Sequence, residues 1–221
     1  MPQTIIGPEA PKNCELCPRL VRFRNETAEH EPGWYNGAVP SFGDPEAELL
    51  IVGLAPGLRG ANRTGRPFTG DASGEMLFEM LSRHGFTAGT FGNRVDDGLT
   101  LKGAMITNAV RCVPPQNRPT GMEVNACRPF LAAQIMALPR LTLVVTLGKI
   151  AHDSTIRALG LRLRDYPFGH NRLYGFKANN RSLSLLSSYH CSRYNLNTRR
   201  LTEEMFCGVF QRARRLLDNK G

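Results

Sequence analysis

The 221-residue chain lacks long hydrophobic runs. Its most apolar stretch, residues 49–57, is nine residues long and contains Pro56, whereas a membrane-spanning helix needs roughly 20 apolar residues. The first residues show no basic cap leading into an apolar region, so the sequence offers no secretory signal. These features exclude a membrane-spanning segment and predict a cytoplasmic protein.

Extremes of composition are absent as well. With 22 Gly, 15 Pro, 41% hydrophobic and 21% charged residues, the chain is neither collagen-like, nor a coiled coil, nor a disordered tail. It contains no internal repeat and no low-complexity segment. A length near 200 favours one buried core, so we expect residues 1–221 to form a single domain.

Acidic residues are few compared with basic ones. The chain has 28 Lys and Arg against 19 Asp and Glu, a formal net charge of +9. Such an excess is typical of proteins with polyanionic partners, including nucleic acids. A solvated basic face would give the same count, so charge alone does not decide the partner.

Short apolar segments alternate with helical patterns along most of the chain. The apolar segments begin near residues 49, 103, 141 and 183, and the helical patterns cover residues 72–84, 120–138, 149–159 and 198–218. Because parallel strands need crossover connections, this alternation predicts a three-layer α/β/α sandwich around a mostly parallel four-stranded sheet. In such sheets ligands bind beyond the carboxyl ends of the strands.

Four of the six cysteines form spaced pairs, namely Cys14, Cys17, Cys112 and Cys127. Disulfides are rare in the cytoplasm, and two thiolate pairs can bind either zinc or an iron–sulfur cluster. The irregular second pair favours a cluster over zinc, and four unligated buried thiols are the structural alternative. Cys191 and Cys207 lie outside this pattern, and we assign them no role.

Five ordered motifs make the chain resemble the iron–sulfur uracil-DNA glycosylases of the family 5 type. They occupy residues 14–19, 53–57, 62–71, 106–112 and 189–195. The resemblance implies hydrolysis of the N-glycosidic bond of uracil in DNA, leaving an abasic site for base excision repair, with hypoxanthine and xanthine as further substrates. It also implies a structural [4Fe-4S] cluster on the four paired cysteines. Zinc is the alternative there.

The chain departs from the better-known uracil enzymes at two positions. The loop at residues 53–57 has no carboxylate or carboxamide to orient a catalytic water, as in the family 5 variant. In addition, Cys191 follows His190 where related enzymes often carry proline. We expect the second change to be tolerated.

A glycosylase must extrude its target base into a pocket and read the base there. Asn108 offers a donor and an acceptor for a base edge, and Phe68 could stack on the base. Without the motifs, Asn108 would be read as satisfying backbone groups and Phe68 as a core residue. The resemblance adds substrate contacts from the first loop, at Gly53, Leu54, Ala55, Pro56 and Gly57.

Cleavage builds positive charge on the sugar and negative charge on the departing base. His190 suits the base, because a neutral imidazole can donate one hydrogen bond to a base oxygen. Asp71 suits the attacking water or the sugar cation. A structural histidine and a helix N-cap are the respective alternatives, and the two roles of Asp71 are compatible if its two oxygens divide them.

Four arginines are candidate DNA contacts. Arg63, Arg66 and Arg118 are expected at phosphates, and Arg193 is expected to enter the duplex where the nucleotide leaves, with a solvated surface role as its alternative. The expected partner is damaged, uracil-containing DNA, single- or double-stranded, bound by a nucleoid-associated monomer. The competing functions are a uracil-DNA binder without turnover and a metal-stabilised nucleic-acid-binding module without chemistry.

Overall fold

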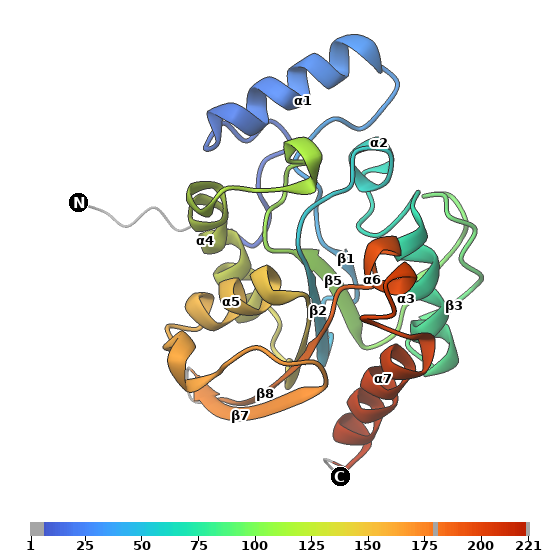
Figure 1. The fold of residues 1–221 in the computed structure, drawn as a ribbon, viewed down its shortest axis with the longest axis vertical. Helices are drawn as coiled ribbons and strands as arrows, with labels where there is room; N and C mark the ends of the chain where they lie inside the picture. The colour runs from blue at the N-terminus through green and yellow to red at the C-terminus, as the bar shows by residue number, and fades with distance from the viewer. Residues whose placement is uncertain (1–6, 179–180, 220–221) are drawn as a thin grey trace.

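A six-stranded mixed sheet forms the centre of the protein (Figure 1). The computed structural model describes residues 7–178 and 181–219. Four parallel strands occupy the middle of the sheet: β5 (Ala104–Asn108), β2 (Leu49–Gly53), β6 (Leu143–Leu147) and β8 (Arg181–Ser188). The antiparallel strands β1 (Phe42–Gly43) and β7 (Arg172–Ala178) form its two edges.

The parallel core matches the sequence prediction, but the predicted number of strands was wrong. All four predicted strands are present, and β2, β5 and β6 are buried along their whole length. Strands covered on both faces read as continuous apolar runs, which made them visible in the sequence. Neither edge strand carries that signal, because β1 has two residues and β7 has only exposed and half-buried positions.

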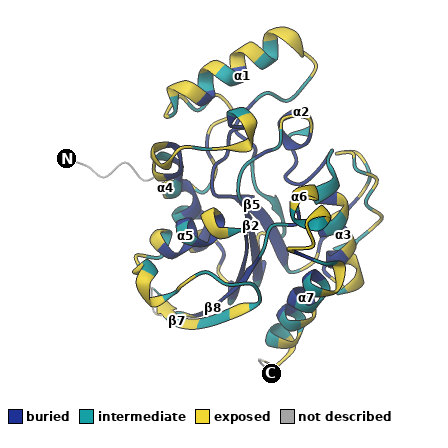
Figure 2. Ribbon diagram, viewed as in Figure 1, coloured by how far each residue is buried: buried dark blue, intermediate teal, exposed yellow. Residues whose placement is uncertain are grey.

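Helices cover both faces of the sheet, which confirms the α/β/α sandwich. On one face α3 (Ala72–Arg83) and α7 (Glu203–Asp218) bury a core around Leu77, Phe78 and Phe210. On the other face α4 (Gly121–Ala137) and α5 (Lys149–Ala158) enclose Leu131 and Val144. Figure 2 shows these helices dark toward the sheet and exposed on their outer sides.

Seven further elements complete the described residues. They are α1 (Pro18–His30), α2 (Ala61–Thr64), β3 (Thr87–Ala88), β4 (Thr100–Leu101), the 3-10 turns η1 (Pro115–Asn117) and η2 (Leu163–Asp165), and α6 (Arg193–Asn197). The last predicted helix begins later than expected, at Glu203, because the Thr202 side chain accepts the Met205 N–H and caps it. In the described residues no helix is long and apolar enough to cross a membrane.

Helix α1 lies beyond the carboxyl ends of the strands, at the top of Figure 1. It packs through Leu20 on a third cluster of buried residues that includes Val110 and Phe130. The N-terminal segment therefore contacts the chain that follows β5, roughly ninety residues away, and both segments bring cysteines to this contact.

Candidate functional site

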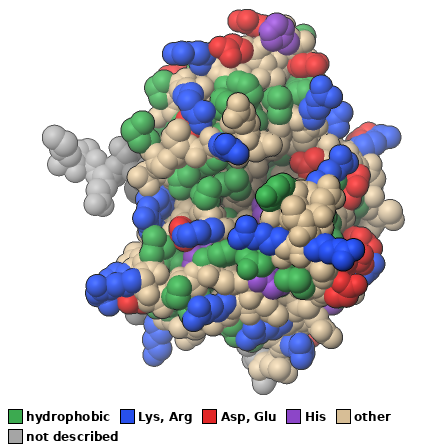
Figure 3. Space-filling view, in the orientation of Figure 1, with side chains coloured by type: hydrophobic (Ala, Val, Ile, Leu, Met, Phe, Trp, Pro, Cys, Tyr) green, Lys and Arg blue, Asp and Glu red, His purple; other side chains and the backbone are tan. Residues whose placement is uncertain are grey.

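A pocket of about 330 Å³ opens at the carboxyl ends of the strands. This volume is within the range typical of small-ligand sites, ~300–1,000 Å³. Its walls include most of the residues that the sequence predicts for base contact and catalysis: Leu54, Ala55, Pro56, Gly57, Phe68, Asp71, Asn108 and His190. Figure 3 shows Lys and Arg side chains spread across the middle of the face seen in Figure 1.

Asn108 ends β5 beside Gly53, its register partner on β2. A Cβ atom on Gly53 would lie 2.4 Å from Asn108 Oδ1 and 2.7 Å from the Phe68 ring, so only glycine fits there. Asn108 is 3% exposed, and its Oδ1 has no hydrogen-bond partner among the described residues. A buried acceptor without a partner costs about 1–3 kcal/mol, which a ligand N–H would recover.

Phe68 is held in a strained backbone conformation at the pocket wall. Its φ angle is +53°, a region that bulky residues rarely occupy. The first turn of α3 approaches it so closely that a Cβ on Gly74 would lie 1.8 Å from the Phe68 carbonyl oxygen. Strain of this kind persists where the surroundings fix the backbone, often at functional sites. The Phe68 ring faces His190 at 6.0 Å between centroids.

The two carboxylate oxygens of Asp71 have different surroundings. Oδ1 accepts the Gly74 N–H at 3.0 Å and caps α3. Oδ2 lies against Gly57 and Gly60, where a Cβ on Gly60 would be only 2.4 Å away. The capping alternative is therefore realised by one oxygen, while the other is placed toward the glycine loop of the pocket.

His190 lies two residues after β8 and lines the same pocket as the loop of residues 54–57. Its backbone carbonyl accepts the Asn195 Nδ2–H at 2.8 Å. Burial lowers the pKa of His190, and the nearby Asp71 carboxylate offsets part of that shift. The imidazole is therefore neutral near pH 7 and can donate one hydrogen bond.

Sequence reasoning missed Asn117, which also lines the pocket. It belongs to η1, where Gln116 and Asn117 have φ angles of +55° and +56°. Consecutive non-glycine residues in this region indicate a loop fixed by its surroundings. Here the surroundings include Arg19, whose Nη2–H donates to the Arg118 carbonyl at 3.0 Å. The proline-rich sequence around Asn117 gave the only available signal.

The arginines divide into exposed and buried ones. Arg63, Arg118 and Arg193 are exposed, as DNA contacts require. The prediction that Arg66 contacts a phosphate does not fit the structure. Its side chain is 6% exposed and pairs with the Asp97 carboxylate at 2.6 Å. Those hydrogen bonds hold the pKa of Asp97 well below its usual range. Arg66 fastens the loop that carries Phe68 and is not available to a phosphate.

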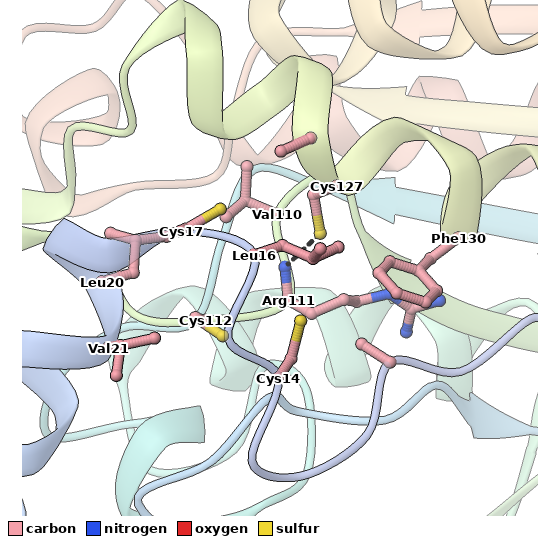
Figure 4. Close-up of a pocket in the computed structure, with 12 residues that line it drawn as sticks. Cys14, Leu16, Cys17, Leu20, Val21, Val110, Arg111, Cys112, Cys127 and Phe130 are labelled. Atoms are coloured by element: carbon pink, nitrogen blue, oxygen red, sulfur yellow. Dashed lines mark hydrogen bonds between the residues drawn. The ribbon is translucent and has the colours of Figure 1, made fainter. Parts of the chain in front are cut away.

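The four paired cysteines line a second, apolar pocket between α1, α4 and the segment after β5. Figure 4 shows their sulfur atoms pointing toward a common space. Burial raises the pKa of Cys112 to about 11 and that of Cys127 to about 12, so free thiols here are neutral at pH 7. As the side chains stand, no three Cys, His, Asp or Glu residues of the described ranges are grouped closely enough to hold one metal ion.

The charge around this thiol pocket fits an anionic centre. Arg24 is 4% exposed, and its guanidinium contacts Cys112 Sγ at 3.6 Å and the Cys14 carbonyl at 3.3 Å. The structure gives it no carboxylate partner in residues 7–178 and 181–219. A buried cation is costly unless it is paired, and four thiolates around a metal centre would supply the opposite charge. The Arg111 N–H also donates to Cys127 Sγ at 3.2 Å.

Residues 40–214 match the sequence profile of the Uracil DNA glycosylase superfamily. The chain belongs to this superfamily. It is 45% identical over 209 residues to a protein named Type-5 uracil-DNA glycosylase from Thermus thermophilus, covering 92% of this chain and 93% of that one. A Type-5 relative from Pyrobaculum aerophilum is 39% identical over 205 residues, covering 91% and 88%.

A more distant superfamily member, named Type-4 uracil-DNA glycosylase, comes from Sulfurisphaera tokodaii. It is 33% identical over 198 residues, which cover 88% of this chain and 77% of the relative. The region matching the superfamily profile contains every predicted pocket residue together with Cys112 and Cys127. The superfamily match therefore includes the part of the chain that forms the pocket.

Proposed function

We propose that this chain is a uracil-DNA glycosylase that hydrolyses the N-glycosidic bond of uracil in DNA and leaves an abasic site. The observation that carries the proposal is the pocket in which the unpartnered Asn108 Oδ1, the Asp71 carboxylate and the His190 imidazole converge. The curated relatives with Type-5 names support the same activity. Base excision repair is the process this reaction serves.

Base recognition follows from the wall formed by Gly53, Phe68 and Asn108. Uracil presents an N–H between two carbonyl oxygens, so its N–H can donate to Asn108 Oδ1, which is buried and free to accept. Phe68 supplies an aromatic face beside that position, and stacking on a base contributes ~1–3 kcal/mol. The loop of residues 54–57 closes the pocket over the base.

Bond cleavage uses two residues with opposite tasks. As the glycosidic bond breaks, electrons move to the base, and the neutral His190 donates a hydrogen bond to the base oxygen that gains charge. Asp71 Oδ2 lies against Gly57 and Gly60 in the same pocket. There it orients the attacking water and stabilises the cationic sugar, replacing the water-orienting group that residues 53–57 lack.

The exposed Arg63, Arg118 and Arg193 bind the DNA around the pocket. Arg63 and Arg118 contact phosphates, which positions the duplex without reading its sequence. Arg193 and its neighbour Tyr194, which is 72% exposed, fill the space that the flipped nucleotide leaves. The enzyme acts as a monomer on chromosomal DNA, and its substrates extend to hypoxanthine and xanthine.

The thiol pocket binds a [4Fe-4S] cluster on Cys14, Cys17, Cys112 and Cys127, with zinc as the alternative. The buried Arg24 supports an anionic centre there. The bound cluster supplies a crosslink between the N-terminal segment and the chain after β5. Glycosidic hydrolysis moves no electrons, so the role of this centre is structural.

The test uses purified protein and matched duplexes that carry uracil, hypoxanthine, xanthine or only normal bases. Free base and abasic sites are measured over several turnovers. We expect release of uracil, with slower release of the purine bases. The variant D71N retains an oxygen to cap α3 but loses the charge, so it should fold normally and cleave at least tenfold more slowly.

Two results would overturn the proposal. Tight uracil-dependent binding without release over several turnovers would indicate a binding protein. Equal affinity for all duplexes with no abasic sites would indicate a nucleic-acid-binding module. D71N cleaving as fast as the parent protein would remove Asp71 from the chemistry and leave it only the capping role.

A further inference from the structure

The backbone leaves the sheet at Tyr189, one residue before His190. Strand β8 pairs with β6 as far as Ser188 and with β7 as far as Ser187. Tyr189 is therefore the first residue with no neighbouring strand to accept its N–H. A half-buried backbone N–H needs another partner at this point.

His170 supplies that partner from the loop before β7. Its Nδ1 accepts the Tyr189 N–H at 3.2 Å, and its ring stacks on the Tyr189 ring with centroids 5.1 Å apart. The Ser188 hydroxyl is 3.5 Å from the same nitrogen and donates to the Tyr189 carbonyl at 2.8 Å. A side chain thus takes the place of a neighbouring strand beside His190.

The protonation state of His170 is fixed by its contacts. Burial lowers its pKa, and a hydrogen bond to the Met205 backbone offsets only part of this. The ring is therefore neutral near pH 7, with its proton on Nε2 toward α7 and a free lone pair on Nδ1. His170 consequently joins three segments: its own loop, the end of β8 and α7.

We propose that His170 is a positioning residue that sets the place of the His190 imidazole in the pocket. The Asn195 side chain donates a hydrogen bond to the His190 carbonyl, and His170 accepts the N–H of Tyr189, the preceding residue. His170 does not line the pocket and touches no reacting atom. It acts through Tyr189, the residue before His190, by accepting the Tyr189 N–H and stacking on the Tyr189 ring.

The consequence for the reaction rests on the proposed function. A hydrogen bond from His190 to the base develops in the transition state, and such contacts are sensitive to displacements of ~1 Å. Arg63 and Arg118, which are proposed to contact phosphates, belong to other segments of the chain. Loss of the His170 contact should therefore lower kcat and leave KM for the DNA nearly unchanged.

The test compares H170A with H170N. Asparagine Oδ1 can take the place of Nδ1 and accept the Tyr189 N–H, whereas alanine cannot. We expect H170A to lower kcat about tenfold, with a KM within twofold of the parent value. H170N should restore most of the kcat. H84A is the matched control, since His84 is another partly buried histidine next to α7, where it contacts Cys207 at 3.4 Å. It should cleave like the parent.

A second readout does not depend on activity. The NMR resonances of the His190 ring should shift in H170A and return toward the parent values in H170N. Unchanged resonances in H170A would overturn the proposal, and so would an equal kcat in all variants or a rate loss that follows only the unfolded fraction. If the parent protein releases no uracil, the proposed function fails, and the resonances still decide the role of His170.

Discussion

Two sites lie on either side of one short segment and are built in opposite ways. Asn108 ends β5 in the candidate active site, and Cys112, four residues later, belongs to the thiol pocket. The active-site pocket is wide, and glycines set its shape by letting backbone and side chains approach closely. The thiol pocket is narrow and apolar, and a buried arginine sets its charge.

The comparison separates two kinds of dependence. The active site depends on shape, because the extra Cβ of an alanine at Gly53, Gly60 or Gly74 would collide with a pocket residue. The proposed role of the thiol pocket depends on charge, because burial keeps free Cys112 and Cys127 thiols neutral and the buried Arg24 guanidinium contacts Cys112 Sγ. Changes of shape and changes of charge should therefore affect the two sites differently.

The largest effect is expected from C127A. Cys127 is buried at the contact between α4 and the N-terminal segment. Its loss should reduce bound metal at least tenfold and destabilise the fold by more than the ~3 kcal/mol of an ordinary core change, because metal binding contributes directly to folding. Metal analysis and thermal unfolding measure this. C207A is the control, and equal losses in the two variants would contradict a metal role for Cys127.

G74A should damage the active site and spare the thiol pocket. The added Cβ would lie 1.8 Å from the Phe68 carbonyl oxygen, so Phe68 or α3 must move. Displacements of ~1 Å can cost about 100-fold in rate, and we expect a loss of that order in kcat/KM with metal content unchanged.

G208A is the matched control for G74A. Gly208 lies within α7, where an added Cβ meets nothing within 4 Å. Replacing a helical glycine with alanine at such a position should stabilise the protein by about 0.5–1 kcal/mol and leave activity unchanged. Full activity in G74A would show that cleavage does not depend on the observed position of Phe68.

R24M should affect the thiol pocket and spare the active site. Methionine keeps much of the side-chain volume and removes the cation on Cys112 Sγ. Changes in residues that surround metal ligands cost ~10–100-fold in metal affinity, so we expect the metal to dissociate about tenfold faster, measured by absorbance during chelation. R22M, an exposed position on the same helix, is the control. Equal rates would show that Arg24 does not stabilise the centre.

The smallest effect concerns the pH dependence of the active site. Because burial lowers the pKa of His190, the folded protein keeps it neutral at pH 6.5, where an unperturbed imidazole is half protonated. Cleavage should persist at that pH and fall only as the pH decreases further, since protonation turns the accepting ring nitrogen of His190 into a second donor and adds a buried positive charge beside the Asp71 carboxylate. A rate midpoint at or above pH 6.5 would contradict this.

The stability of the fold should also decrease at acidic pH. The unfolded chain binds more protons than the folded one below pH 6.5, because burial also lowers the pKa of His152 and His170. The free energy of unfolding should therefore decrease as the pH falls from about 6.5. Thermal unfolding at a series of pH values measures this.

Much of the candidate site was predictable because it follows secondary structure. Parallel strands end at one edge of a sheet, so Asn108, His190 and the loop after β2 had to lie near each other. Asp71 stands directly before a helical pattern, and its capping role follows from that position. Asn117 was missed because its loop has no periodicity, and only the folded chain shows that it turns into the pocket.

The sequence by itself determined the layers, the parallel strands and the segments that meet at their ends, because hydrophobic periodicity and turn residues act locally. It could not decide which arginine meets DNA and which meets a buried carboxylate. Arg63 and Arg66 are three residues apart, yet one is exposed and the other is paired with Asp97. Nor could it reveal that Arg24 contacts Cys112 or that His170 supports Tyr189. Those contacts join segments distant in the chain, and only tertiary packing brings them together.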